Sequence, residues 1–128
     1  MAFIFLYIKN KMLSSHGIIN LMHVALIAPL LIYVGIARDT IPEWLFYVLG
    51  GLGIIVLLYQ LYKAYGKIKE GKSAWINWIH VFLVAPLLIL LGVLRNDADR
   101  RYFVMLLLLG CGALGYHGIY LMREMMLA

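Results

Sequence analysis

The stretch INLMHVALIAPLL, residues 19–31, is repeated as INWIHVFLVAPLL at residues 76–88. The copies are 57 residues apart, and this separation pairs 12 identical residues among the 20 positions that start at Ile19. It continues without gaps into the following segments, where it pairs Phe46 with Phe103. Agreement over a constant separation predicts an internal duplication, in which each half of the chain forms the same supersecondary unit.

The chain around these copies is very apolar: 65% of its 128 residues are hydrophobic and 13% are charged. A soluble domain is usually about 45–50% apolar and about 25% charged. Apolar stretches of about 20 residues, separated by clusters of charge, predict helices that cross a hydrocarbon core of about 30 Å. Four stretches have this length: residues 16–37, 44–62, 74–94 and 102–122.

The predicted fold is all-α, an integral membrane four-helix bundle, because a helix satisfies its own backbone hydrogen bonds in lipid. We expect a single membrane domain over residues 1–128, composed of a first helical hairpin at 16–63 and a second at 73–123. Each hairpin contains two spans, so both enter the membrane from the same side and form parallel repeats.

Loop charge predicts the orientation of the spans in the membrane. Seven basic residues lie on the side of the termini and central loop: Lys9, Lys11, Lys63, Lys67, Lys69, Lys72 and Arg123. Four lie on the other side, offset by acidic neighbours: Arg38, Arg95, Arg100 and Arg101. The positive-inside rule therefore places both termini of this multi-pass protein in the cytoplasm. The lysines lie where topology alone would put them, so the expected partner is the lipid bilayer and no nucleic acid.

Polar residues recur inside the spans at positions related by the duplication. Each copy of the repeated phrase holds an asparagine and a histidine three residues apart, on one helix face. The second and fourth spans hold Gln60 and His117 at equivalent positions. At a rise of about 1.5 Å per residue, these side chains fall at similar depths in an up-down-up-down bundle. The sequence thus predicts one polar layer of candidate binding residues: Asn20, His23, Gln60, Asn77, His80 and His117.

Ionisable groups in a span are costly and by default indicate function. Imidazole changes charge near physiological pH and is a common metal ligand. We therefore expect a proton or metal-cation binding or conducting site, with His23, His80 and His117 as the ligands of a transition metal ion such as zinc or copper. No Asp or Glu lies within the four stretches. This absence favours a passive channel or ion site over a coupled pump.

Two alternative functions remain open. His23 and His80 on diagonal helices match the axial ligands of haem b in a redox bundle, although bulky Trp78 and Phe82 restrict the space beside His80. Alternatively, the polar side chains only join helices through hydrogen bonds of about 0.6 kcal/mol each. The protein is then a structural or scaffolding membrane protein with no ligand, able to form a homo-oligomer. The sequence indicates no catalytic residues, which favours a non-enzymatic role.

Pro29 and Pro86 are mid-span prolines at equivalent positions. Proline lacks the amide hydrogen that would bond to the carbonyl one turn earlier, near Ala25 and Phe82. We therefore expect these prolines to kink the first and third helices. A kink that improves packing is the simpler interpretation, and carbonyls that line a cavity are the alternative.

The stretches NWIHVFLVAPLL, from Asn77, and LGCGALGYHGIYLM, from Leu109, resemble small membrane proteins encoded by large DNA viruses of algae and protists. The resemblance covers the second half of the chain, and it extends to the first half through the duplication. It implies a viral or protist context, with a viral protein located in a virion membrane or a host endomembrane. It implies no activity and assigns no site residue.

Overall fold

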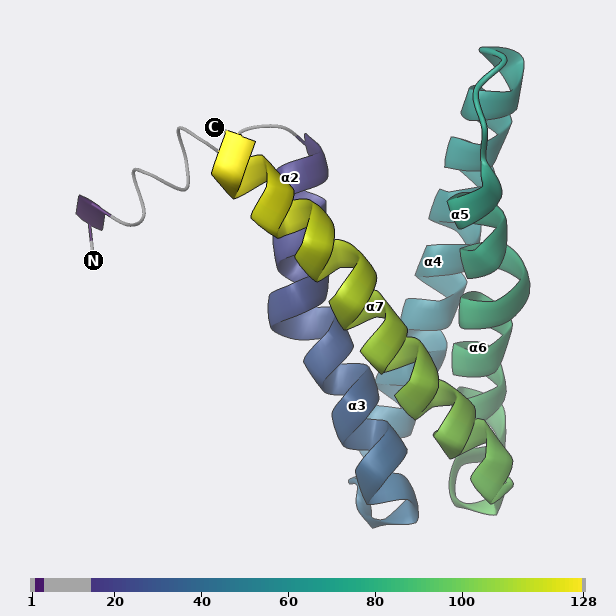
Figure 1. Ribbon diagram of the computed structural model, residues 1–128. Helices are drawn as coiled ribbons and strands as arrows, with labels where there is room; N and C mark the ends of the chain where they lie inside the picture. The colour runs from purple at the N-terminus through teal and green to yellow at the C-terminus, as the bar shows by residue number, and fades with distance from the viewer. Residues whose placement is uncertain (1, 4–14, 128) are drawn as a thin grey trace. The chain divides into compact units, whose positions relative to one another are not determined.

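The computed structural model describes residues 2–3 and 15–127 (Figure 1). Over these residues every regular element is helical, and four segments are long and apolar enough to cross a membrane. They are Gly17–Ala37, Glu43–Lys69, Trp75–Asp97 and Arg100–Met126. The predicted all-α class and the four predicted spans are confirmed, and they fit an integral membrane protein. Lys9 and Lys11, used above to predict orientation, lie outside the described residues.

The first and third spans are each built from three consecutive helical segments, whereas the second and fourth are single helices. The first comprises α2 (Ser15–Met22), the π-helix η1 (His23–Ile27) and α3 (Ala28–Ala37). The third comprises α5 (Trp75–Ile79), the π-helix η3 (His80–Val84) and α6 (Ala85–Leu94). The second and fourth are α4 (Glu43–Lys69) and α7 (Arg100–Leu127). Short 3₁₀ segments, η2 (Arg38–Thr40) and η4 (Arg95–Asp97), follow α3 and α6.

The two π-helices lie directly before the turns that contain Pro29 and Pro86. Each closes with an amide five residues beyond a histidine: Ala28 donates to the carbonyl of His23, and the equivalent alanine donates to the carbonyl of His80. A wide turn of this kind is a known response to a break in the α-helical hydrogen-bond ladder. The hydrogen-bond ladder is thus interrupted before each proline by a π-helix that begins at the histidine of the repeated phrase, and the expected kinks stay a prediction.

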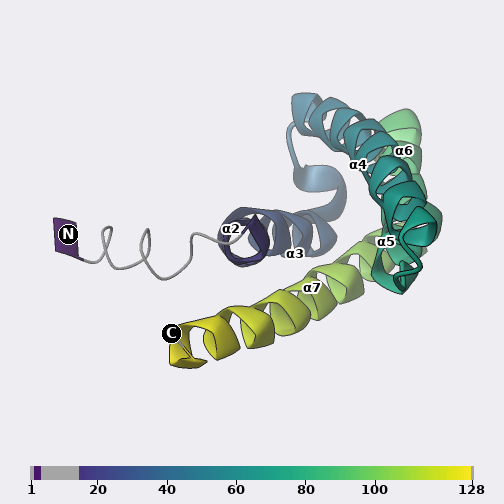
Figure 2. The same ribbon diagram turned by 90° about the horizontal axis from the view of Figure 1, so that it is seen from above.

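Cα packing divides the chain into two compact units. Among the described residues, the first unit contains those up to Ile36 and those from Met105 onward, and the second contains Ala37–Val104. In the second unit α4 packs along α5, η3 and α6, as Figures 1 and 2 both show. In the first unit α3 packs against α7 around Leu107 and Gly110. Within the two units, the first span thus packs with the fourth and the second span packs with the third. The two hairpins, which were inferred from the sequence repeat, remain a prediction.

Glycines bring the paired helices into backbone contact in both units. A Cβ atom on Gly53 of α4 would lie 2.9 Å from the backbone nitrogen of Ile89 in α6. A Cβ atom on Gly110 of α7 would lie 3.0 Å from the backbone nitrogen of Ile32 in α3. Both residues of the first contact are 57 positions from their counterparts in the second, so the same contact occurs in each unit. Small residues allow such close packing in lipid, where the hydrophobic effect does not drive helices together.

A second glycine contact obeys the same relation. A Cβ atom on Gly92 would lie 2.6 Å from the Cα atom of Gly50, and one on Gly35 would lie 2.8 Å from the backbone nitrogen of Leu107. These two pairs are again related by 57 positions. The neighbouring backbone leaves no space for a side chain at either glycine, so these contacts define how closely the helices approach.

Apolar side chains fill the contact between α4 and α6 in the second unit, where Leu49, Leu88 and Leu91 are fully buried. Phe46, also fully buried, meets Phe103 edge-on with ring centroids 6.3 Å apart. Many large apolar side chains on other faces of the helices are exposed. Exposure of this extent is expected where lipid replaces water as the solvent.

Candidate functional site

A buried polar cluster joins the first and fourth spans within the first unit. The Nδ1 atom of His117 on α7 lies 2.8 Å from Oδ1 of Asn20 on α2, and both residues are buried. The half-buried ring of His23 stacks on His117, with ring centroids 4.0 Å apart and 24° between the planes. Tyr116 meets the His117 ring edge-on at 5.0 Å. Three helical segments thus hold two imidazoles and one amide in contact.

Hydrogen bonds indicate which nitrogen of each imidazole carries a hydrogen. Nδ1 of His23 lies 2.8 Å from the carbonyl oxygen of Ile19, and Nδ1 of His80 lies 2.8 Å from that of Ile76. A carbonyl oxygen only accepts, so Nδ1 is the donor in both rings, and in a neutral ring Nε2 then carries the lone pair. With Nδ1 donating to an amide oxygen, His117 has the same tautomer. Nε2 is therefore the atom of each ring that can take up a proton.

The second unit has an equivalent cluster in which glutamine stands in place of the histidine. Nδ2 of Asn77 donates to Oε1 of Gln60 at 2.6 Å, and Nζ of Lys67 donates to Oδ1 of Asn77 at 2.8 Å. Asn77 is buried, whereas Gln60 and Lys67 are half-buried. The Asn77–Gln60 pair is related by 57 positions to the Asn20–His117 pair. One interhelical hydrogen bond is thus made twice, once with an imidazole and once without.

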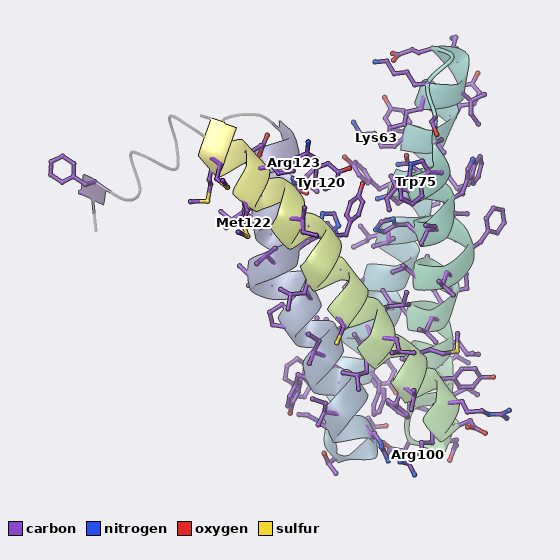
Figure 3. The ribbon with its side chains drawn as sticks, viewed as in Figure 1. Lys63, Trp75, Arg100, Tyr120, Met122 and Arg123 are labelled. Atoms are coloured by element: carbon purple, nitrogen blue, oxygen red, sulfur yellow. The ribbon has the colours of Figure 1, made fainter. Side chains whose placement is uncertain are left out.

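Sequence reasoning missed Lys67, which it counted only as a basic residue of the central loop. Helix α4 instead continues to Lys69, so Lys67 lies seven residues after Gln60, two turns along the same helix face. The seven-residue spacing from Gln60 was the sequence feature that could have identified Lys67. The aliphatic stem of a lysine can lie along an apolar surface while its ammonium group reaches a polar partner. Figure 3 shows Lys63 and Trp75 at the same end of the second unit, where α4 leads into α5.

The six predicted site residues fall into two groups of three. The first unit holds Asn20, His23 and His117, and the second holds Gln60, Asn77 and His80. Within residues 2–3 and 15–127, no group of three or more His, Cys, Asp or Glu side chains is placed to hold a metal ion. The predicted metal site at His23, His80 and His117 therefore gains no support. The two histidines expected to ligate haem b belong to different units, and that alternative remains a prediction.

Comparison with known proteins places this chain in no family. No family model matches it, and no curated protein or solved structure shows significant similarity to it. The resemblance to viral membrane proteins therefore stays a prediction. Function has to be inferred from the chemistry of the two clusters.

Proposed function

We propose that this protein binds and conducts protons in the membrane, and that the site is the first-unit cluster of Asn20, His23 and His117. One observation carries the proposal: two imidazoles stack at 4.0 Å beside a buried hydrogen bond, within segments long and apolar enough to span a membrane. Ionisable side chains in such segments are costly and are retained mainly where they bind or move ions.

The stacked pair has the chemistry needed to bind a proton. Each ring uses Nδ1 as a donor, so each can accept one proton at Nε2. Two imidazolium charges about 4 Å apart would repel each other by about 4 kcal/mol at an effective dielectric constant of 20. The pair therefore holds one proton in preference to two. A site that holds one proton at a time can release it onward and then take up another.

A structural role is the second candidate function, and the second unit supplies the observation that favours it. There Gln60 makes the interhelical bond to Asn77 at 2.6 Å without an imidazole. Hydrogen bonds of this kind between membrane helices contribute about 0.6 kcal/mol on average. On this alternative His117 only joins α7 to α2, and a glutamine would serve equally well.

The substitution His117→Gln separates these two functions, because it copies into the first unit the side chain that the second unit uses. The purified variant and the unmodified protein are reconstituted into liposomes that contain a pH-sensitive dye. A potassium diffusion potential set by valinomycin then drives proton entry. The matched control is Gln60→Ala, which removes the bond of the second unit and leaves both stacked imidazoles in place.

If the protein conducts protons through this site, we expect His117→Gln to fold normally and its proton flux to be at least tenfold lower than that of the unmodified protein. The Gln60→Ala control is expected to keep its flux, because the stacked imidazoles are unchanged. Wild-type flux in folded His117→Gln, or no flux in the unmodified protein, would reject the proposal in favour of the structural role. An absorption spectrum with a Soret band, or stoichiometric metal in elemental analysis, would instead support haem or a metal ion.

We also propose that both termini and the loop between α4 and α5 face the cytoplasm. The loop end of the second unit is rich in lysine, whereas at the opposite end Arg95 is paired with Glu43 at 3.2 Å. Loop lysines are retained on the cytoplasmic side. A Lys69→Cys variant in a Cys111→Ser background tests the orientation. Labelling of intact cells by a membrane-impermeant maleimide would contradict it.

The architecture that we propose is a duplicated hairpin with parallel repeats. Support comes from features that recur after 57 residues: the two π-helices, the two glycine contacts and the bond made by each asparagine. The equivalent segments η2 and η4 also pack against each other, as expected beside a two-fold axis. An experimental structure in which residues 16–63 and 73–123 fail to superpose would reject the duplication.

A further inference from the structure

Helix α7 continues past the predicted span and adds a carboxylate to the face that carries His117. The predicted span ends at Met122, whereas α7 continues to Leu127 and includes Glu124. Residues 102–122 contain no Asp or Glu, but helix α7 carries a carboxylate beyond them. Glu124 is half-buried, and its Oε2 atom is covered by protein. It lies seven residues after His117, which is two turns along the same face.

The second unit shows where a side chain at this position reaches. Lys67 is 57 residues before Glu124, and its Nζ atom donates to Oδ1 of Asn77 at 2.8 Å. The corresponding asparagine of the first unit is Asn20, which makes the equivalent interhelical bond. Glu124 therefore occupies the helix position equivalent to Lys67, and the first unit has an acid where the second has a base.

The orientations of the two asparagine amides agree with these opposite charges. In the second unit Asn77 turns Oδ1 to Lys67 and Nδ2 to Gln60. In the first unit Asn20 turns Oδ1 to His117. Its Nδ2 atom, which only donates, is then on the side that corresponds to the lysine contact. A donor on that side suits a carboxylate, just as the amide oxygen in the second unit suits an ammonium group.

We propose that Glu124 is the proton-exchanging carboxylate of the first-unit site and passes protons between the membrane surface and the two imidazoles. This inference rests on the proposed proton conduction. A glutamate side chain is one bond shorter than a lysine, about 1.5 Å, so one water molecule suffices to bridge the carboxylate to the Asn20 amide. Asn20 is a positioning residue, because its amide orients the water and His117 without carrying the proton.

The transfer step balances without any other reactant. The O–H bond of protonated Glu124 breaks as the bridging water takes that proton, and a chain of water molecules passes one proton on to Nε2 of an imidazole. The products are a carboxylate and an imidazolium, so the neutral pair becomes an ion pair. The imidazolium then releases the proton onward, and the carboxylate takes another from the membrane surface.

A surface role is the competing explanation for Glu124. Arg123 is its neighbour in the chain, and the Arg123 guanidinium lies 5.8 Å from the ring centroid of Tyr120. Figure 3 shows Tyr120, Met122 and Arg123 along the last turns of α7. If Glu124 only offset this positive charge, its replacement would leave proton flux unchanged. Its acidity, as distinct from its charge, is therefore the property to test.

The experiment measures proton flux of the full chain in the same dye-loaded liposomes. We expect Glu124→Gln to lower the flux at least tenfold, and Glu124→Asp to keep it within about threefold of the unmodified protein. Lys67→Gln, the matched substitution in the second unit, is expected to leave the flux unchanged. Infrared difference spectra across a pH jump should contain a carboxyl band that shifts in Glu124→Asp.

Each outcome decides a different point. Wild-type flux in Glu124→Gln, together with lost flux in His117→Gln, would overturn the role of Glu124 and leave the proposed function standing. Wild-type flux in folded His117→Gln would overturn both. An equal loss of flux in Lys67→Gln would show a general effect of charge and also overturn the role of Glu124. If Glu124→Gln does not fold, a carboxyl band that is identical in Glu124→Asp and the unmodified protein overturns it.

Discussion

Replacing Gly92 with alanine would add a methyl group at the closest approach between α6 and α4. The new Cβ atom would lie 2.6 Å from the Cα atom and 3.0 Å from the nitrogen of Gly50, and 3.1 Å from the carbonyl oxygen of Phe46. Non-bonded carbon atoms normally lie about 3.5–4.0 Å apart, so the helices must separate by about 1 Å. All three neighbouring atoms belong to the backbone and cannot rotate away.

Overpacking of this kind usually costs about 1–3 kcal/mol. Because backbone must move, we expect Gly92→Ala to lower the free energy of unfolding by about 2–3 kcal/mol, a change of about 30-fold or more in the ratio of folded to unfolded protein. The assay is unfolding by SDS in mixed micelles, followed by tryptophan fluorescence. All the tryptophans lie in the second unit, as Gly92 does: Trp44, Trp75 and Trp78.

Gly51→Ala is the matched control on α4, because a Cβ atom there would meet nothing within 4 Å. We expect this variant to be unchanged or stabilised by up to about 1 kcal/mol, since alanine is the better helix former. Equal stability of the Gly92→Ala and Gly51→Ala variants, whether both are stable or both are destabilised, would refute the close approach of α4 and α6.

Two further substitutions test the second unit. Asn77→Leu leaves Lys67 and Gln60 without their hydrogen-bond partner and is expected to cost about 1–3 kcal/mol in the same SDS assay; stability equal to that of the unmodified protein would contradict the bonds. Asp99 accepts from the side chain of Arg101 at 3.2 Å and from its backbone amide at 2.9 Å, and these bonds hold the pKa of its carboxyl group below the usual range. A lowered pKa contributes stability above the unfolded pKa of about 3.9, and this contribution is lost as the pH falls through the lower folded value. Asp99→Asn should therefore weaken the acid dependence of stability slightly, and an unchanged profile between about pH 5 and pH 2 would contradict this effect.

The sequence alone was sufficient to place the four spans, because the length of an apolar stretch is set by the thickness of the bilayer. The two long helices nevertheless extend beyond their apolar stretches, to Lys69 in α4 and Leu127 in α7. A helix needs only backbone hydrogen bonds to continue, so its end does not have to coincide with the first charged residue. For this reason sequence reasoning placed Lys67 at the central loop and ended the fourth stretch at residue 122, although Lys67 and Glu124 both lie in helices.

The repeat also indicated which residues are equivalent and which share a helix face, because a helix has a fixed periodicity. It did not indicate which helices pack together. That choice depends on how closely two backbones can approach, and only the tertiary structure places Gly53 against Ile89 and Gly110 against Ile32. The same packing brings His117 to Asn20, because hydrogen-bonded side chains on different spans meet only after the helices are paired.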